Sequence, residues 1–201
     1  MTLPSPFAYP KKAHVRRHGP YGCQRYGEYR NWLRDEFSFR CVYCLRRETW
    51  LTTRKDHEID HFLPQRDHED IENDYDNLVF ACRECNGTKG AKYLPSPAKV
   101  AYGDCLRVDE LGEIHAKNEQ GEIMIEILRL DAPERTALRR RILETIDESS
   151  PGTKTMKWCL GYPDNLPDLS KETAPKGNKR PSGINDSSFD RRRRKSLPEY
   201  Y

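Results

Sequence analysis

Residues 41–89 contain four short motifs: CVYC at 41–44, EIDHFLP at 58–64, DNLVF at 76–80 and CRECNGTK at 82–89. The first and last motifs each hold two cysteines separated by two residues. Two such pairs supply four thiolates, the usual ligands of a tetrahedral structural Zn²⁺. We therefore expect one zinc site, with the chain between the pairs inserted between two zinc knuckles. Its ligands would be Cys41, Cys44, Cys82 and Cys85.

The inserted segment carries a carboxylate next to an imidazole, Asp60 and His61, at the end of a short alternating run. Neighbouring side chains on a strand point to opposite faces. One of the pair can therefore hold a hard cation while the other, as a neutral imidazole, accepts a proton. This division suits metal-assisted hydrolysis. His57 is a possible accessory ligand, although we favour a plain surface role for it.

The order of these motifs, with Asp-His first, then Asn77-Leu78, then C-x-x-C-N-x-x-K, resembles the zinc-containing branch of the HNH endonuclease family. The resemblance covers about residues 39–93. It implies an α+β fold with a small ββα-metal core flanked by the two cysteine pairs. It also implies hydrolysis of phosphodiester bonds in DNA.

The resemblance further implies a role for each motif residue. His61 would be the general base, and Asn77 would bond the backbone across the loop after the first strand and so orient His61. Asp60 and Asn86 would ligate one Mg²⁺ or another divalent ion through oxygen atoms. Lys89, in the helical turn after Asn86, is a candidate phosphate contact, with a solvated surface role as an equal alternative.

Patterns outside the motifs predict flanking helices and a β-hairpin. Aromatic and apolar residues recur at three- and four-residue steps between Tyr26 and Phe37, which predicts an amphipathic helix. Residues 114–116 and 123–127 alternate on either side of Gly121, which predicts a hairpin. Asp131, with a proline and a glutamate after it, predicts the capped start of a helix.

Basic residues are concentrated at both ends of the chain. Residues 1–40 carry eight Lys/Arg against three Asp/Glu, and residues 171–201 carry nine against four, which leaves a net −7 between them. This distribution favours arms that contact a polyanion around a centre that holds cations. The candidate contacts near the N-terminal end are Arg16, Arg17, Arg25, Arg30, Arg34 and Arg40.

Composition suggests three regions. Only 35% of the 201 residues are hydrophobic and 33% are charged, so we expect part of the chain to be unpacked. Residues 1–22 would form a mobile basic arm. Residues 23–150 would form the nuclease domain, with motif core 39–93 and an accessory hairpin and helix at 113–148. Residues 151–201 would be a Pro/Gly/Ser-rich linker and a disordered basic tail.

Three functions compete at this stage: a DNA endonuclease, a non-catalytic zinc-dependent nucleic-acid-binding module, and a protein adaptor. The complete, ordered motif set favours the nuclease. No apolar run approaches the ~20 residues that span a bilayer, so we expect a cytoplasmic protein with no membrane partner. By family analogy its setting would be phage defence or restriction, with a partner ATPase or another defence protein.

Overall fold

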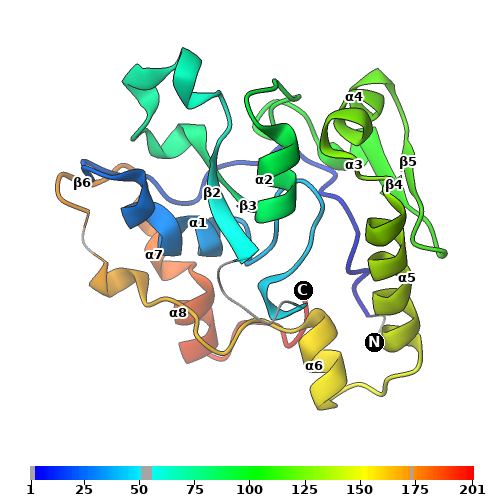
Figure 1. Ribbon diagram of the computed structural model, residues 1–201. Coiled ribbons are helices and arrows are strands. Elements are labelled where there is room, and N and C mark those ends of the chain that lie inside the picture. The colour runs from blue at the N-terminus through cyan, green and yellow to red at the C-terminus, as the bar shows by residue number, and fades with distance from the viewer. Residues whose placement is uncertain (1–2, 51–55, 173) are drawn as a thin grey trace. The chain divides into compact units, whose positions relative to one another are not determined.

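The computed structural model describes residues 3–50, 56–172 and 174–201 (Figure 1). These residues form an α+β fold with short helices and three two-stranded antiparallel sheets. Within these ranges, no helix is both long and apolar enough to cross a membrane. The chain divides into two compact units, each built from segments distant in sequence. Unit 1 draws on residues 1–14, 87–162 and 199–201, and unit 2 on residues 15–86 and 163–198.

The sheet that carries the motifs lies in unit 2. Strand β2 (His57–His61) pairs antiparallel with β3 (Leu78–Cys82), and the register runs from His57 opposite Cys82 to His61 opposite Leu78. Helix α2 (Arg83–Lys89) follows β3 directly. All five residues of β3 are buried, which fits its unbroken apolar sequence, whereas β2 is partly exposed. The predicted order of two strands and a helix is confirmed.

The predicted helix between Tyr26 and Phe37 is also confirmed. It begins as the 3-10 helix η1 (Tyr26–Tyr29) and continues as α1 (Arg30–Glu36), which packs against β3. Tyr29 of η1 and Leu33 of α1 are fully buried.

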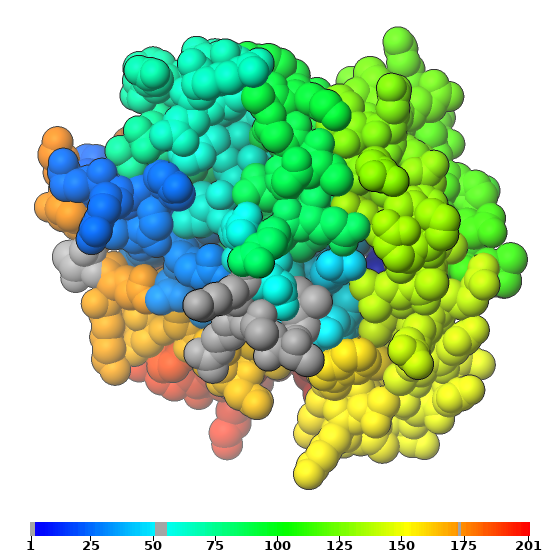
Figure 2. All heavy atoms as spheres, in the orientation of Figure 1, coloured from blue at the N-terminus to red at the C-terminus, as the bar shows by residue number. Residues whose placement is uncertain are grey.

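The connections within unit 2 contain several short 3-10 turns. They are η2 (Glu48–Trp50), η4 (Gln65–Asp67), η5 (Glu69–Ile71) and η6 (Tyr75–Asn77). The turns η4 and η5 lie in an acidic loop after β2 whose side chains reach the surface, in turquoise in Figure 2.

The two ends of unit 2 are folded, in contrast to the mobile arm and disordered tail that composition suggests. Strand β1 (Pro20–Tyr21) pairs with β6 (Gly177–Asn178). The later residues form η7 (Leu169–Lys171), α7 (Ser182–Asn185) and α8 (Ser188–Arg193).

A buried charge explains why these terminal segments of unit 2 are folded. The Asp35 carboxylate is fully buried, and it lies 2.8 Å from His18 Nε2 and accepts a 2.8 Å bond from the Ser188 backbone N–H. A buried carboxylate needs such partners, so the segments that supply them are held although they contain few apolar residues.

Unit 1 corrects the hairpin prediction. Strand β5 (Ile114–Ala116) forms as predicted, but it pairs with β4 (Leu106–Val108), and residues 119–128 are helical. In this helix, α4 (Glu119–Leu128), Met124 and Leu128 are fully buried one turn apart. The Asn118 side chain accepts from the Gly121 backbone N–H at 3.0 Å and caps the helix start. Cap and helical spacing therefore override the short alternation of isoleucines.

The other helices of unit 1 are α3 (Tyr102–Cys105), α5 (Pro133–Asp147) and α6 (Lys154–Leu160). Helix α5 confirms the predicted helix, with Pro133 at its first position and Ile142 buried. Its N-cap residue is Ala132, which makes no side-chain bond, so the predicted Asp131 cap is not formed.

Replacement of Asp35 should destabilise the protein in a pH-dependent way. Burial by itself raises the pKa of the Asp35 carboxyl, but the hydrogen bond from His18 and the charge of Arg17 outweigh it and hold that pKa below its ordinary value. The carboxylate therefore stabilises the fold above about pH 4, and this contribution is lost as pH falls through the folded-state pKa. Asp35→Asn should cost about 3 kcal/mol in the free energy of unfolding at neutral pH.

Urea denaturation of both proteins between acid and neutral pH measures this difference, which should shrink in acid. Asp186→Asn, at an exposed residue of the same C-terminal segment, is the control and should change stability little. A difference that stays constant with pH would contradict the assigned role of the ionised carboxylate.

Candidate active site and zinc centre

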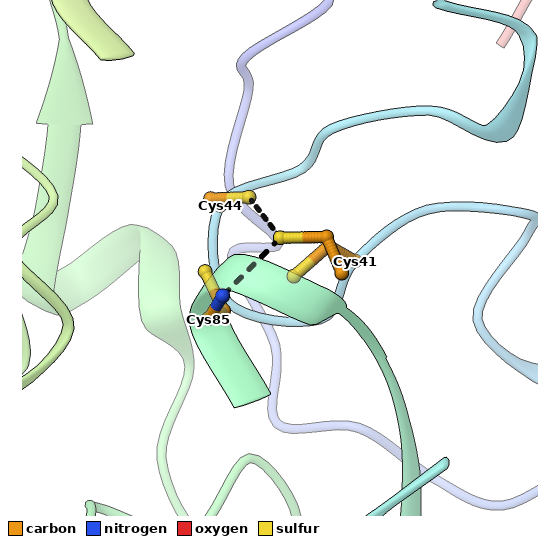
Figure 3. Close-up of side chains that lie close together, drawn as sticks. Cys41, Cys44 and Cys85 are labelled. Carbon is orange, nitrogen blue, oxygen red and sulfur yellow. Dashed lines mark hydrogen bonds between the residues drawn. The ribbon is translucent and has the colours of Figure 1, made fainter. Parts of the chain in front are cut away.

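The four cysteines of the two pairs cluster as a zinc knuckle. Figure 3 labels three of them, Cys41, Cys44 and Cys85. Their Sγ atoms all lie within 4.8 Å of one another, and the Sγ atoms of Cys44 and Cys82 are 3.6 Å apart. Sulfur atoms on a tetrahedral Zn²⁺ are separated by about 3.8 Å, so the arrangement fits this metal. Cys41, Cys82 and Cys85 are fully buried.

Each knuckle is built by local backbone bonds. In the first, the Cys41 N–H donates to the Arg46 carbonyl at 2.8 Å and the Leu45 N–H donates to the Cys41 carbonyl at 3.0 Å. This turn places Leu45 in the left-handed region, with a φ of 61°. In the second, at the junction of β3 and α2, the Cys85 N–H donates to Cys82 Sγ at 3.5 Å.

The thiols of this cluster influence one another strongly. Burial raises the pKa of the Cys41 thiol well above its ordinary value, because an isolated thiolate there would be poorly solvated. Hydrogen bonds from the Cys41, Cys82 and Cys85 thiols hold the pKa of the Cys44 thiol well below its ordinary value. Four neighbouring thiolates, three of them buried, would repel one another without a cation, and Zn²⁺ is the cation that this ligand set favours.

Asp60 and His61 end strand β2 and differ in exposure, as neighbours on a strand do. Asp60 is 4% exposed, and its Oδ2 accepts a 2.5 Å hydrogen bond from the hydroxyl of Tyr43. His61 is half-buried, and its Nε2 lies 3.0 Å from the backbone carbonyl oxygen of Glu72. The adjacent residues thus face different surroundings and can perform different chemistry.

Asn77 spans the loop that follows β2. Its side-chain Oδ1 accepts from the Leu63 N–H at 2.9 Å, and its Nδ2 donates to the Leu63 carbonyl at 3.2 Å. Its own carbonyl accepts from the Phe62 N–H at 2.8 Å. These three bonds fix the backbone immediately after His61.

Asn86, in α2, contacts β2 through a carboxylate that the motif analysis does not single out. Its Nδ2 donates to Glu58 Oε2 at 2.9 Å, and Arg83 Nε donates to Glu58 Oε1 at 2.9 Å. These hydrogen bonds hold the pKa of the Glu58 carboxyl below its ordinary value, and the bond from Asn86 has the larger effect. Because the amide nitrogen is bound to Glu58, the amide orientation leaves Oδ1 as the atom with metal-ligand chemistry.

Tyr43 is the other residue that sequence reasoning misses. It lies between Cys41 and Cys44, is fully buried, and links the first knuckle to Asp60. Its position inside a C-x-x-C motif is the available signal. A buried tyrosine needs a partner for its hydroxyl, but the sequence does not show which one.

Two side chains expected near solvent are buried. His57 is 2% exposed, stacks on Phe80 with ring centroids 4.9 Å apart, and has Nε2 3.1 Å from the Arg46 carbonyl, so the surface role favoured above is wrong. Lys89, which falls in unit 1, is fully buried, in contrast to a solvent-facing phosphate contact.

Several arginines of the basic N-terminal segment are used inside the protein. Arg16 donates to the Leu78 carbonyl at 2.6 Å, Arg30 donates to the His57 carbonyl at 2.7 Å, and Arg34 pairs with Glu48 at 2.8 Å. A guanidinium carries five donors in a fixed fork, which suits backbone oxygens and carboxylates as well as phosphates. Arg16, Arg30 and Arg34 thus bind groups of the protein itself, in contrast to the expected contacts with nucleic acid.

The ββα arrangement, with its zinc knuckles, defines a class of metal-dependent nuclease cores. Residues 41–92 match the model of the HNH endonuclease family, which confirms the resemblance found in the motifs. Because HNH domains are generally nucleases, this segment of about a quarter of the chain supports phosphodiester hydrolysis with a nucleic-acid substrate. No curated protein was found to match the chain.

Loss of any one zinc ligand should destabilise the fold rather than only slow a reaction. We expect about one tightly bound Zn²⁺ per chain after dialysis, and its loss in Cys82→Ser, because a structural zinc contributes folding free energy directly. Metal analysis and thermal unfolding measure both effects. Cys105→Ser replaces another fully buried cysteine and should retain the zinc. A folded, zinc-free wild-type protein would contradict this assignment.

Proposed function

We propose that the protein is a metal-dependent endonuclease that hydrolyses phosphodiester bonds in DNA with His61 as general base. The observation that carries this proposal is the position of His61 at the end of β2, with Nε2 3.0 Å from the Glu72 carbonyl oxygen. The proposed setting in phage defence or restriction, with a partner ATPase, rests on family analogy alone.

The contact with Glu72 supports one tautomer of the proposed base. A carbonyl oxygen only accepts hydrogen bonds, so the proton of a neutral His61 imidazole belongs on Nε2 and the lone pair on Nδ1. In the proposed reaction, Nδ1 takes a proton from a water molecule whose oxygen attacks the phosphorus. Asn77 supports this step indirectly, since its bonds to Leu63 hold the backbone that follows His61.

Asp60 and Asn86 have the ligand chemistry for the catalytic cation. They supply a carboxylate and an amide oxygen from β2 and α2 of the same core, and hard divalent ions such as Mg²⁺ prefer oxygen ligands. Such a cation would stabilise the negative charge on the phosphate and on the departing oxygen. Tyr43 and Glu58 would hold these two ligands in place through the bonds described above.

Variants of His61 and Asp60 should fail in different ways. His61→Ala removes the base, so it should keep DNA binding, zinc and Mg²⁺ affinity while the single-turnover cleavage rate falls roughly 10²-fold or more. Asp60→Ala removes an anionic ligand, so its residual activity should need more Mg²⁺.

Cleavage of a supercoiled plasmid, followed against Mg²⁺ concentration, measures these effects. His68→Ala, in the acidic loop after β2, is the matched control and should cleave normally. Wild-type cleavage by His61→Ala would overturn the mechanism. DNA binding without cleavage by the wild type at any divalent metal tested would favour the non-catalytic binding module.

Exposed cations of α8 and the residues after it are the proposed phosphate contacts of the C-terminal segment. The Arg193 and Arg194 side chains are 73% and 54% exposed. Deletion of the whole segment would also remove the Ser188 hydrogen bond to the buried Asp35 carboxylate and so disturb the fold. Point variants are therefore the sharper test. Arg193→Gln with Arg194→Gln should weaken DNA binding and reduce the slope of log affinity against log salt by about 0.9 for each phosphate that is no longer neutralised.

The control for net charge is Lys154→Gln with Lys157→Gln, on exposed positions of α6. Binding isotherms at several salt concentrations, with zinc content measured in parallel, separate the two pairs. Equal slopes in both double variants would show that α8 is not a contact surface.

A further inference from the structure

We propose that Tyr26 is a positioning residue that holds the His61 imidazole in the orientation required for proton transfer. This inference rests on the proposed function of His61. Tyr26 lies in η1, outside the segment that matches the HNH model, so it is a contribution of the flanking chain to the site.

The two rings are in direct contact. Their centroids are 4.7 Å apart and their planes meet at 76°, which is an edge-to-face arrangement. Such pairs are favourable because the positive edge of one ring meets the negative face of the other, and the attraction depends on the angle between the planes. The contact therefore favours one plane for the imidazole.

Tyr26 is itself held in place by η1, the turn to which it belongs. In a 3-10 helix, residues three apart lie on the same face, so Tyr26 and Tyr29 share a face of η1. Tyr29 is fully buried, and its ring packs edge-to-face on Tyr75 with centroids 5.6 Å apart. The Tyr75 hydroxyl in turn donates to Glu36 Oε2 at 3.1 Å. Tyr26 is thus a partly exposed ring whose turn is fixed by the buried side chain of Tyr29.

The hydrogen bond to Glu72 depends on the orientation of the imidazole, which the Tyr26 ring can restrict. The bond from Nε2 to a carbonyl favours one tautomer only while the ring keeps the orientation that allows this bond, and a tilted ring weakens it. Glu72 also belongs to the loop that contains η4 and η5, whereas Tyr26 is anchored through Tyr29, the buried residue of its own turn. With both contacts, the direction of Nδ1 is set by two separate parts of unit 2. Misplacement of a reacting group by about 1 Å can cost roughly 10²-fold in rate.

The test compares Tyr26→Leu, which removes the ring but keeps an apolar side chain, with Tyr26→Phe, which keeps the ring. Tyr21→Leu is the matched control, because Tyr21 is 38% exposed against 36% for Tyr26 and lies in the same unit. Two readouts are measured on the full chain with zinc bound. One is single-turnover plasmid cleavage with DNA affinity, and the other is the ¹⁵N NMR shifts of the His61 ring, assigned by comparison with His61→Ala.

For Tyr26→Leu we expect about tenfold or greater loss of cleavage rate with DNA affinity and zinc retained, and His61 ¹⁵N shifts moved toward a mixture of tautomers. Tyr26→Phe should restore most of the rate and the wild-type shifts. Wild-type shifts and rate in Tyr26→Leu would overturn the proposal. Equal losses in Tyr26→Phe and Tyr26→Leu would also overturn it, since the ring would then not be the active feature. If the wild type does not cleave DNA, the proposed function fails, and the NMR shifts alone decide the role of Tyr26.

Discussion

The four-cysteine cluster joins two parts of the chain that the rest of the site depends on. Residues 41–44 bring Tyr43, whose hydroxyl reaches Asp60, and residues 82–85 form the turn from which α2 carries Asn86. Asp60 is therefore connected to the group of sulfur atoms through Tyr43, and Asn86 directly follows Cys85. Two strands and one short helix bury too little apolar surface to set such positions alone, and a metal held by the four cysteines would supply the missing folding free energy.

Buried polar contacts allow a chain with only 35% hydrophobic residues to fold along most of its length. Arg34 and Glu48 are about nine-tenths buried and joined at 2.8 Å, and His18 with Asp35 is fully buried. Pairs of this kind do not add much net stability, because removal of the charges from water offsets their attraction. They do, however, disfavour any fold in which the two partners are separated, because the loss of one partner leaves a buried charge without compensation.

The motif core can be predicted because its signals are local, and two C-x-x-C pairs with an Asp-His dipeptide allow few arrangements. The alternation at residues 123–127 predicts a strand wrongly, since five residues are too short to outweigh a capped helical turn. Contacts between distant segments leave no local signal. Nothing near Ser188 shows that its N–H will meet Asp35. Likewise, the sequence indicates a cation ligand at Asp60, but its link to Tyr43 depends on how the first knuckle folds against β2.

The order in which unit 2 can fold follows from where its closing contacts lie. Strand β1 can pair with β6 only after residues 177–178 have been synthesised. Asp35 likewise accepts a hydrogen bond from a backbone N–H that is 153 positions further along the chain. All four zinc ligands, by contrast, lie within residues 41–85. Loop closure over long separations is slow, and domains fold as their residues leave the ribosome. During synthesis the metal cluster can therefore form first, whereas the fold around it stays open until the C-terminal segment has been translated.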